Sequence, residues 1–156
     1  MTWPLIDHRL DDMVARTHAE GISDLAAAAL IEHDGRFLLV ETAAPDFDTP
    51  CGWELPTGRV RAGETLLTGL ERVLLEHFGL DAAAVPPRYL GHNDHRDHRD
   101  ADRDTRIFVF AVTCTNPDSI CHTAHVGHRW IDNLSISTTV NNVDHLLRTY
   151  YADNVA

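Results

Sequence analysis

The sequence predicts a single α/β domain, because strand-like apolar runs alternate with stretches of helical periodicity. The clearest helix lies within residues 58–80, where four apolar residues recur at helical spacing and define one core-seeking face. These residues are Leu67, Leu70, Leu74 and Phe78. Asp34-Gly35 separates two apolar runs, residues 25–31 and 37–40, which predicts a β-hairpin. A chain of 156 residues fits one domain with a sizeable core.

The first half of the chain divides into a helix, the hairpin and a further strand. Residues 7–20 predict a helix whose inward-facing side chains are Leu10, Met13, Val14 and Thr17. The run Leu25–Ile31 contains four alanines that suit a helix by propensity. Its hairpin partner and its short length favour a buried strand instead. Residues 43–52 form a proline-containing loop, and residues 53–55 begin the next strand.

The second half predicts three strands and a closing helix. The strands are residues 88–92, 107–112 and 125–132, the last anchored by Trp130, and the helix is 137–151. The polar segment 92–106 between two of these strands is typical of a solvated hairpin loop. Its three-residue histidine spacing also suggests a metal site, although we favour the mixed-charge loop. The histidines concerned are His92, His95 and His98.

Composition excludes several classes of partner. A net charge of −11 argues against a surface that binds nucleic acid or an anionic membrane. The sequence shows neither an apolar run of membrane-spanning length nor a charged-then-apolar leader. Three cysteines, an odd number without CxxC spacing, fit reduced thiols in a cytoplasmic protein. They are Cys51, Cys114 and Cys121.

The segment 58–80 resembles the signature of the Nudix hydrolases, which fixes glycine, glutamate, arginine and apolar positions at defined gaps. Seven positions match: Gly58, Glu64, Arg72, Leu74, Glu76, Gly79 and Leu80. Thr65 is a plausible helix entry and Gly79 a natural helix stop. Two positions depart from the signature, since Val73 and His77 stand where the family has glutamates.

The resemblance implies an α/β/α sandwich with a mixed sheet and the loop–helix–loop of the box on one face. It implies one Nudix domain over residues 1–156, with an N-terminal helical segment at 1–23. It also implies a hydrolase of a nucleoside diphosphate linked to another moiety, such as a second nucleotide or a sugar. A homodimer is common in the family.

The departures from the signature bear on the metal site that the resemblance implies. Residues 73, 76 and 77 stand at i, i+3 and i+4 of one helix, where the family's carboxylates hold divalent cations. Here that set reads valine, glutamate and histidine, so we expect a single cation, Mg²⁺ or Mn²⁺. Glu76 and His77 would bind it together with the Thr57 carbonyl. Alternatively, Glu76 is an exposed helix charge and His77 a tolerated substitution.

Three further box residues have a functional and a structural interpretation. The resemblance implies that Glu64 and Arg72 orient and charge-balance the site, although a purely structural ion pair is equally reasonable. Arg59, directly after the box glycine, is placed for a bidentate phosphate contact. The alternative for Arg59 is a solvated loop residue.

His125 is the candidate general base. The GDP-mannose mannosyl hydrolases, a Nudix subgroup, also lack the first helix glutamate and carry a base histidine five residues before a tryptophan. The chain is similar to them at Arg59, His125 and Trp130 but differs at His77, where they keep a metal-binding glutamate. A histidine base is chemically sensible at neutral pH. The alternative is an ordinary strand histidine.

Two functions therefore follow from the sequence. The first is a metal-dependent hydrolase in which Glu76, Arg72, Glu64 and His125 are catalytic and Arg59 and Trp130 bind substrate. The second is a catalytically silent Nudix fold that binds a nucleotide or a protein. Val73 favours silence because an apolar side chain neither ligates a metal nor relays a proton.

Overall fold

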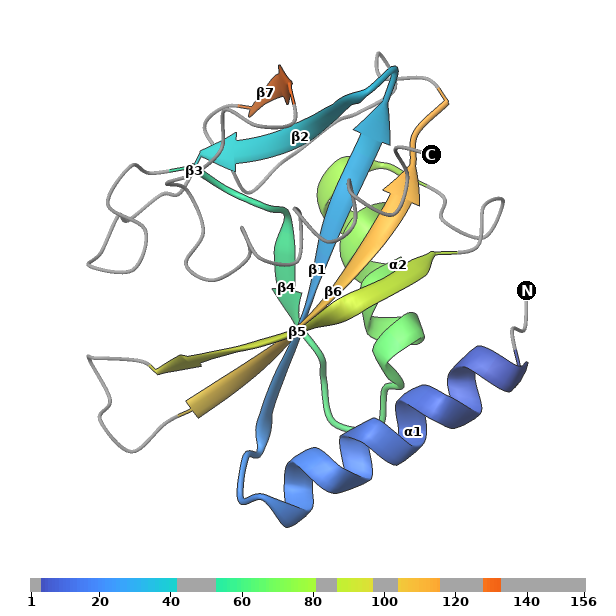
Figure 1. Ribbon diagram of the computed structural model, residues 1–156, viewed down its shortest axis with the longest axis vertical. Coiled ribbons are helices and arrows are strands. Elements are labelled where there is room, and N and C mark those ends of the chain that lie inside the picture. Colours follow the sequence, from blue (N-terminus) through green and yellow to red (C-terminus); the bar gives the residue numbers. More distant parts are fainter. Residues whose placement is uncertain (1–3, 42–52, 81–86, 97–103, 116–127, 133–156) are drawn as a thin grey trace.

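Strand β1 (Asp24–His33) is the strand around which the sheet of the computed structural model is built (Figure 1). It pairs with β2 (Arg36–Glu41), β4 (Thr57–Arg59) and β6 (Asp104–Thr113). The structure describes residues 4–41, 53–80, 87–96, 104–115 and 128–132. Within them the remaining elements are α1 (Pro4–Ala19), β3 (Trp53–Glu54), α2 (Leu66–Phe78), β5 (Arg88–Arg96) and β7 (His128–Asp132).

The sheet is mixed, as expected. Its central path runs β3-β2-β1-β6-β5, with β4 attached to β1 and β7 attached to β2. Strands β1 and β6 are parallel from Asp24↔Thr105 to Glu32↔Thr113, whereas the other pairs are antiparallel. Figure 1 shows β1 and β6 running together along the long axis, with α1 crossing one end of the sheet.

The predicted hairpin between β1 and β2 is confirmed. Asp34 and Gly35 have φ values of 49° and 75°, which are the two left-handed residues that a tight hairpin turn of this hand requires. The register His33↔Arg36 closes the turn. The turn therefore fixes which side chains of the two strands stand next to one another at this end of the sheet.

The sheet forks at β1, and the fork positions the box. Next to the turn β1 pairs with β2, whereas further back Ala26, Ala27 and Ala28 pair with β4. Strand β2 leaves β1 to pair with β3 and β7. Strand β4 thus lies beside the centre of β1, and α2 follows it after a short loop.

The two faces of the sheet carry two hydrophobic clusters. Alternate residues of β1, β2 and β6 belong to the first cluster, together with the apolar faces of both α1 and α2. The intervening strand residues form the second cluster, with Leu55 and Ile131. Both described helices therefore cover the same face. The helix predicted at 137–151, which the sandwich would need on the other face, lies outside the described residues.

The alanine run adopts the strand conformation because it is buried on both sides. Ala26 to Ala29 are 0–4% exposed, and they pair with β4 on one edge and β6 on the other. Small side chains in the central strand let a helix approach one face closely while the second cluster packs on the other. Tertiary burial overrides the helix propensity of alanine here.

The helix of the box is confirmed with both of its ends. The Thr65 side chain accepts from the Thr68 N–H, and Gly79 ends the helix at a φ of 68°. The four predicted core residues are at most 3% exposed: Leu67, Leu70, Leu74 and Phe78. The inward residues predicted for the N-terminal helix are also confirmed, since Leu10 and Thr17 are buried and Met13 and Val14 pack against the first cluster.

The prediction of a solvated hairpin loop over residues 92–106 is wrong at both ends of that segment. Residues up to Arg96 extend β5, and residues from Asp104 begin β6, so the hairpin is real but its strands are longer than predicted. Within this segment, residues 97–103 fall outside the described chain. Arg106 is 9% exposed. The polar composition of the segment therefore did not predict that Arg106 is buried.

Arg106 joins the N-terminal helix to the β5–β6 hairpin. Its guanidinium donates to both carboxylate oxygens of Asp94, at 2.7 and 3.0 Å, and lies 2.7 Å from the Glu20 carboxylate. It also donates to the Thr17 hydroxyl at 3.3 Å. The hydrogen bonds from Arg106 to Asp94 lower the pKa of Asp94 below its ordinary value, because they favour its ionised form. The cluster anchors α1 to the sheet.

We predict that Asp94→Asn lowers the free energy of unfolding at pH 7 by about 1 kcal/mol, since Arg106 keeps Glu20 and Thr17 as partners. A depressed pKa contributes stability above the unfolded-state value, near 3.8, and loses it as the pH falls through the folded-state pKa. The difference between wild type and variant should therefore shrink as the pH falls below 3.8. Denaturant titrations at pH 7 and pH 3 measure it, and a pH-independent difference would contradict the assignment.

Candidate active site

The box glycine, Gly58, lies inside strand β4, where the sequence predicted the start of a loop. Gly58 pairs with Ala27, whose side chain belongs to the cluster beneath α2, so Gly58 also faces the helix. A Cβ atom at Gly58 would stand 2.3 Å from Cγ2 of Val73. Glycine is therefore required at this position because α2 lies directly on the β4 backbone.

Val73 occupies the place of the first helix glutamate of the Nudix signature. It is 2% exposed and belongs to the first hydrophobic cluster. The side-chain carboxylate of Glu76, one turn later, is 50% exposed. Of the positions expected to share one metal-binding face, Val73 is in the core and Glu76 is at the surface.

Arg72 ties the helix to the strand and to the loop between them. Its Nε and one terminal nitrogen donate to the two carboxylate oxygens of Glu64 at 2.8 and 3.0 Å. The same terminal nitrogen donates to the Arg59 carbonyl at 2.7 Å. The backbone N–H of Arg61 donates to Glu64 at 2.8 Å. Glu64 and Arg72 therefore form an ion pair, which both the functional and the structural interpretation of the sequence require.

The pair is electrostatically strong because it is poorly exposed. The side chains of Glu64 and Arg72 are 15% and 16% exposed. Hydrogen bonds from Arg72 hold the pKa of Glu64 below its ordinary value, and the bond to Glu64 raises the pKa of Arg72. Both oxygens of Glu64 are occupied as acceptors, so its carboxylate serves to position Arg72 and the loop.

Glu76 is held near the same arginine. Its carboxylate lies 3.5 Å from Arg72 at i,i+4 spacing and 3.9 Å from the exposed guanidinium of Arg61. One guanidinium thus lies between the Glu64 and Glu76 carboxylates. Sequence reasoning passed over Arg61, although it stands three residues before Glu64, within reach of a loop contact.

The ladder between β1 and β4 determines where the Thr57 carbonyl points. The N–H of Ala29 donates to Pro56 and the N–H of Val60 donates to Leu25. In an antiparallel pair this pattern turns the intervening carbonyls of Thr57 and Arg59 away from β1. The Arg59 carbonyl accepts from Arg72, so the Thr57 carbonyl stands on the same strand edge as Arg72.

This donor set fits one hard cation. A carboxylate at Glu76 and a carbonyl at Thr57 are the oxygen ligands that Mg²⁺ or Mn²⁺ takes from a protein when phosphates and water complete the shell. Glu64 is committed to Arg72 and Val73 has no donor atom. In the described part of the chain, histidine, cysteine and acidic side chains do not come together in threes at metal-binding distance.

The side chain of Arg59 lies on the face of β4 that points away from α2, whereas Arg72 lies on α2 itself. Thr57 and Arg59 flank Gly58 on β4, and successive strand residues project to opposite faces. Because Gly58 faces α2, the side chains of Thr57 and Arg59 project to the other face. The Thr57 hydroxyl donates to the Leu55 carbonyl at 2.8 Å, and Arg59 is exposed.

The remaining predicted residues lie elsewhere or outside the described part. Trp130 is on β7, opposite Leu38 of β2, and packs against the first hydrophobic cluster near the β1–β2 turn. His125 lies outside the described residues, as does the side chain of His77. His92 is exposed on β5 with its ring against Phe108 at 5.9 Å, and His98 lies outside the described residues.

We predict that Glu64→Gln lowers the free energy of unfolding by about 1–3 kcal/mol at neutral pH, because the mostly buried Arg72 loses its nearer ionic partner and keeps, among the described residues, only Glu76 at 3.5 Å. The depressed pKa of Glu64 means that this stabilisation is present above 4.5 and is lost as the pH falls through the lower folded-state value. Thermal unfolding at pH 7 and pH 3.5 measures both. Asp11→Asn on the exposed side of α1 is the matched control; an equal loss in both variants would contradict the prediction.

The fold is shared with solved structures of low sequence identity. The Escherichia coli ORF135 protein is 21% identical with a TM-score of 0.67, over 87% of this chain and 94% of that one. The MutT protein of Methanosarcina mazei is 20% identical with a TM-score of 0.67, over 85% and 96%. The E. coli dihydroneopterin triphosphate pyrophosphohydrolase is 16% identical with a TM-score of 0.65, over 85% and 99%.

A family comparison reaches the same conclusion from sequence. No curated protein matches the chain. The sequence model of the NUDIX domain, however, matches residues 23–145, which is most of the chain and includes the whole box. Together with the fold and the Gly58–Arg72–Glu64 arrangement, this match shows that the chain belongs to the Nudix family.

Proposed function

We propose that the protein is a metal-dependent hydrolase that cleaves a nucleoside diphosphate linked to a second moiety. One observation carries the proposal: the half-exposed Glu76 carboxylate lies 3.5 Å from Arg72, which also holds the Arg59 carbonyl at the edge of β4. A carboxylate and the Thr57 carbonyl are thereby presented at one helix–strand junction. The pyrophosphohydrolase among the structural neighbours is named for a reaction of the same class.

Glu76, His77 and the Thr57 carbonyl are the proposed ligands of one divalent cation, Mg²⁺ or Mn²⁺. When bound there, such a cation neutralises diphosphate charge and lowers the pKa of an attacking water. Arg72 orients Glu76, and Glu64 positions Arg72. Arg61, whose guanidinium lies 3.9 Å from the Glu76 carboxylate, contributes positive charge at this junction in a chain whose net charge is −11, which favours a phosphate here.

His125 is the proposed general base. A neutral imidazole accepts a proton from water near pH 7 without assistance from a second carboxylate, which suits a box that has lost one at Val73 and another at His77. With this base, water attacks the sugar carbon and releases free sugar and nucleoside diphosphate. Attack at phosphorus would instead release a nucleoside monophosphate.

A silent nucleotide- or protein-binding domain is the second candidate. The burial of Val73 against Gly58 favours this candidate, because an apolar side chain stands where the signature has a carboxylate. Among the described residues of the junction, Glu64 is hydrogen-bonded to Arg72, and Glu76 is the one carboxylate outside such a short pair.

The structure also bears on membrane association. Within the described chain no helix is long and apolar enough to cross a membrane. A cytoplasmic location and a homodimer stay predictions.

The decisive assay incubates the protein with nucleoside triphosphates, dinucleotides and nucleotide sugars in Mg²⁺, Mn²⁺ or Zn²⁺ and identifies every product. We expect Glu76→Gln to lower metal-dependent kcat by roughly 100-fold or more, because a bound metal contributes several kcal/mol of transition-state stabilisation. Asp12→Asn, which removes the same charge from the exposed face of α1, should retain wild-type turnover.

Unchanged turnover in Glu76→Gln would contradict the hydrolase as proposed. Absence of turnover with every substrate, combined with saturable nucleotide binding, would favour the silent domain. The identity of the products separates attack at carbon from attack at phosphorus, and so tests His125 independently of Glu76.

A further inference from the structure

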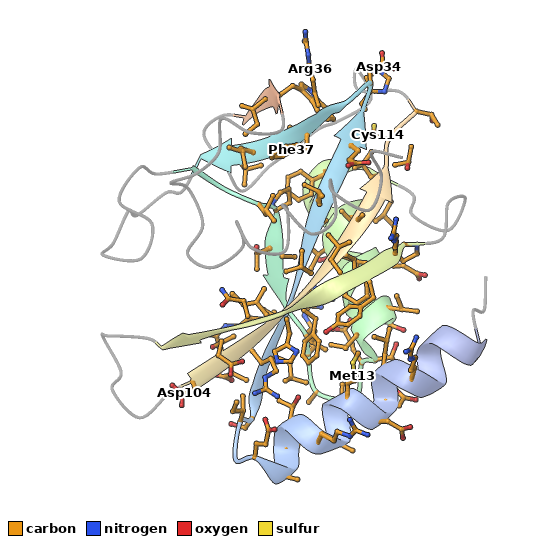
Figure 2. All side chains as sticks on the ribbon, viewed as in Figure 1. Met13, Asp34, Arg36, Phe37, Asp104 and Cys114 are labelled. Carbon is orange, nitrogen blue, oxygen red and sulfur yellow. The ribbon has the colours of Figure 1, made fainter. Side chains whose placement is uncertain are left out.

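A cavity of about 410 Å³ opens at the hairpin end of the sheet. Its lining within the described chain is His33, Asp34, Arg36 and Trp130. His33 pairs with Arg36, and Trp130 pairs with Leu38 of the first hydrophobic cluster, so these side chains project from the face that α2 covers further along. Figure 2 shows Asp34, Arg36 and Cys114 together at this end of the molecule.

The His33 ring is fixed by a residue far away in the sequence. Its Nδ1 lies 2.8 Å from the Cys114 carbonyl, at the end of β6. A carbonyl oxygen only accepts, so Nδ1 carries the hydrogen and Nε2 of the neutral ring is an acceptor. The tautomer and orientation of His33 are thus set by the parallel pairing of β1 with β6.

Nε2 of His33 faces a second acceptor. The Asp34 carboxylate lies 3.3 Å from Nε2, and the Asp34 side chain is 88% exposed. Two acceptors at this separation repel each other unless a hydrogen lies between them, either on a protonated ring or on a ligand that donates to both. An amino group on a ligand supplies two such hydrogens.

The other wall of the cavity is aromatic and basic. The Trp130 ring lies 6.1 Å from the His33 ring in an edge-to-face arrangement at 62°, and Trp130 is half-buried against the core. A flat ligand can therefore stack along the indole while its edge meets Asp34 and His33. Arg36 places a guanidinium in the same lining.

We propose that this cavity binds the base of a nucleoside, with an amino-bearing heterocycle stacked along Trp130 and hydrogen-bonded to Asp34 and to Nε2 of His33. The cavity volume is within the range of small-molecule sites, about 300–1,000 Å³. The Asp34 carboxylate disfavours a phosphate here, so the neutral end of a nucleotide is the part that fits. The identity of the ligand rests on the proposed function.

The test uses nucleosides without phosphate and without metal, which separates it from hydrolysis. Adenosine, guanosine, cytidine and uridine are titrated into the full-length protein by calorimetry. We expect saturable binding of the three bases that carry an amino group, and weaker binding of uridine. Asp34→Asn should lower the affinity at least tenfold, and Trp130→Leu should abolish binding.

Asp34→Asn is the informative variant because asparagine tolerates the positive φ of 49° and keeps the turn. Asp11→Asn, on the exposed face of α1, is the charge-matched control and should bind like wild type. Failure of every nucleoside to bind wild type, or unchanged affinity in a folded Asp34→Asn, would overturn the proposal. Nucleoside binding in a protein without turnover would support the cavity and contradict the hydrolase.

Discussion

The contact between Val73 of α2 and the Gly58 backbone of β4 is the constraint on which the site depends. With no side chain at Gly58, the helix lies directly on the strand, and a Cβ there would stand 2.3 Å from Val73. This close approach lets Arg72 reach the Arg59 carbonyl and Glu64 at the same time. It also places the apolar Val73 side chain where the Nudix signature has a carboxylate, which is why the proposed metal site relies on Glu76.

The electrostatic arrangement around Arg72 follows from that approach. Arg72 is mostly buried and satisfied by Glu64, which raises its pKa and fixes its direction. Glu76 stays at the surface, 3.5 Å from the same guanidinium, and is available to a ligand. In a chain of net charge −11, Arg61 and Arg72 place two guanidinium groups beside Glu76, and the proposed diphosphate site relies on them.

Local signals predicted the parts of the fold that depend on neighbouring residues. Thr65 and Gly79 bounded α2 correctly, and Asp34-Gly35 gave the hairpin, because caps and tight turns are short-range features. The parallel pairing of β1 with β6 was not predictable, since it joins strands about 80 residues apart. The burial of Arg106 depends on that pairing and on α1, so the polar sequence around it predicted a solvated loop instead.

The same division between local and tertiary signals applies to the site. Sequence spacing predicted that Glu64 and Arg72 could pair. Only the tertiary structure shows the burial of Val73, the direction of the Thr57 carbonyl and the His33–Cys114 hydrogen bond.

The proposed metal site is tested most directly by a crystal structure of the wild-type protein with Mn²⁺ and a non-hydrolysable nucleoside diphosphate derivative, with anomalous scattering used to locate the metal. We expect one Mn²⁺ peak, bound by the Glu76 carboxylate and the Thr57 carbonyl. Two or more peaks at the box, or a peak that does not contact Glu76, would contradict it.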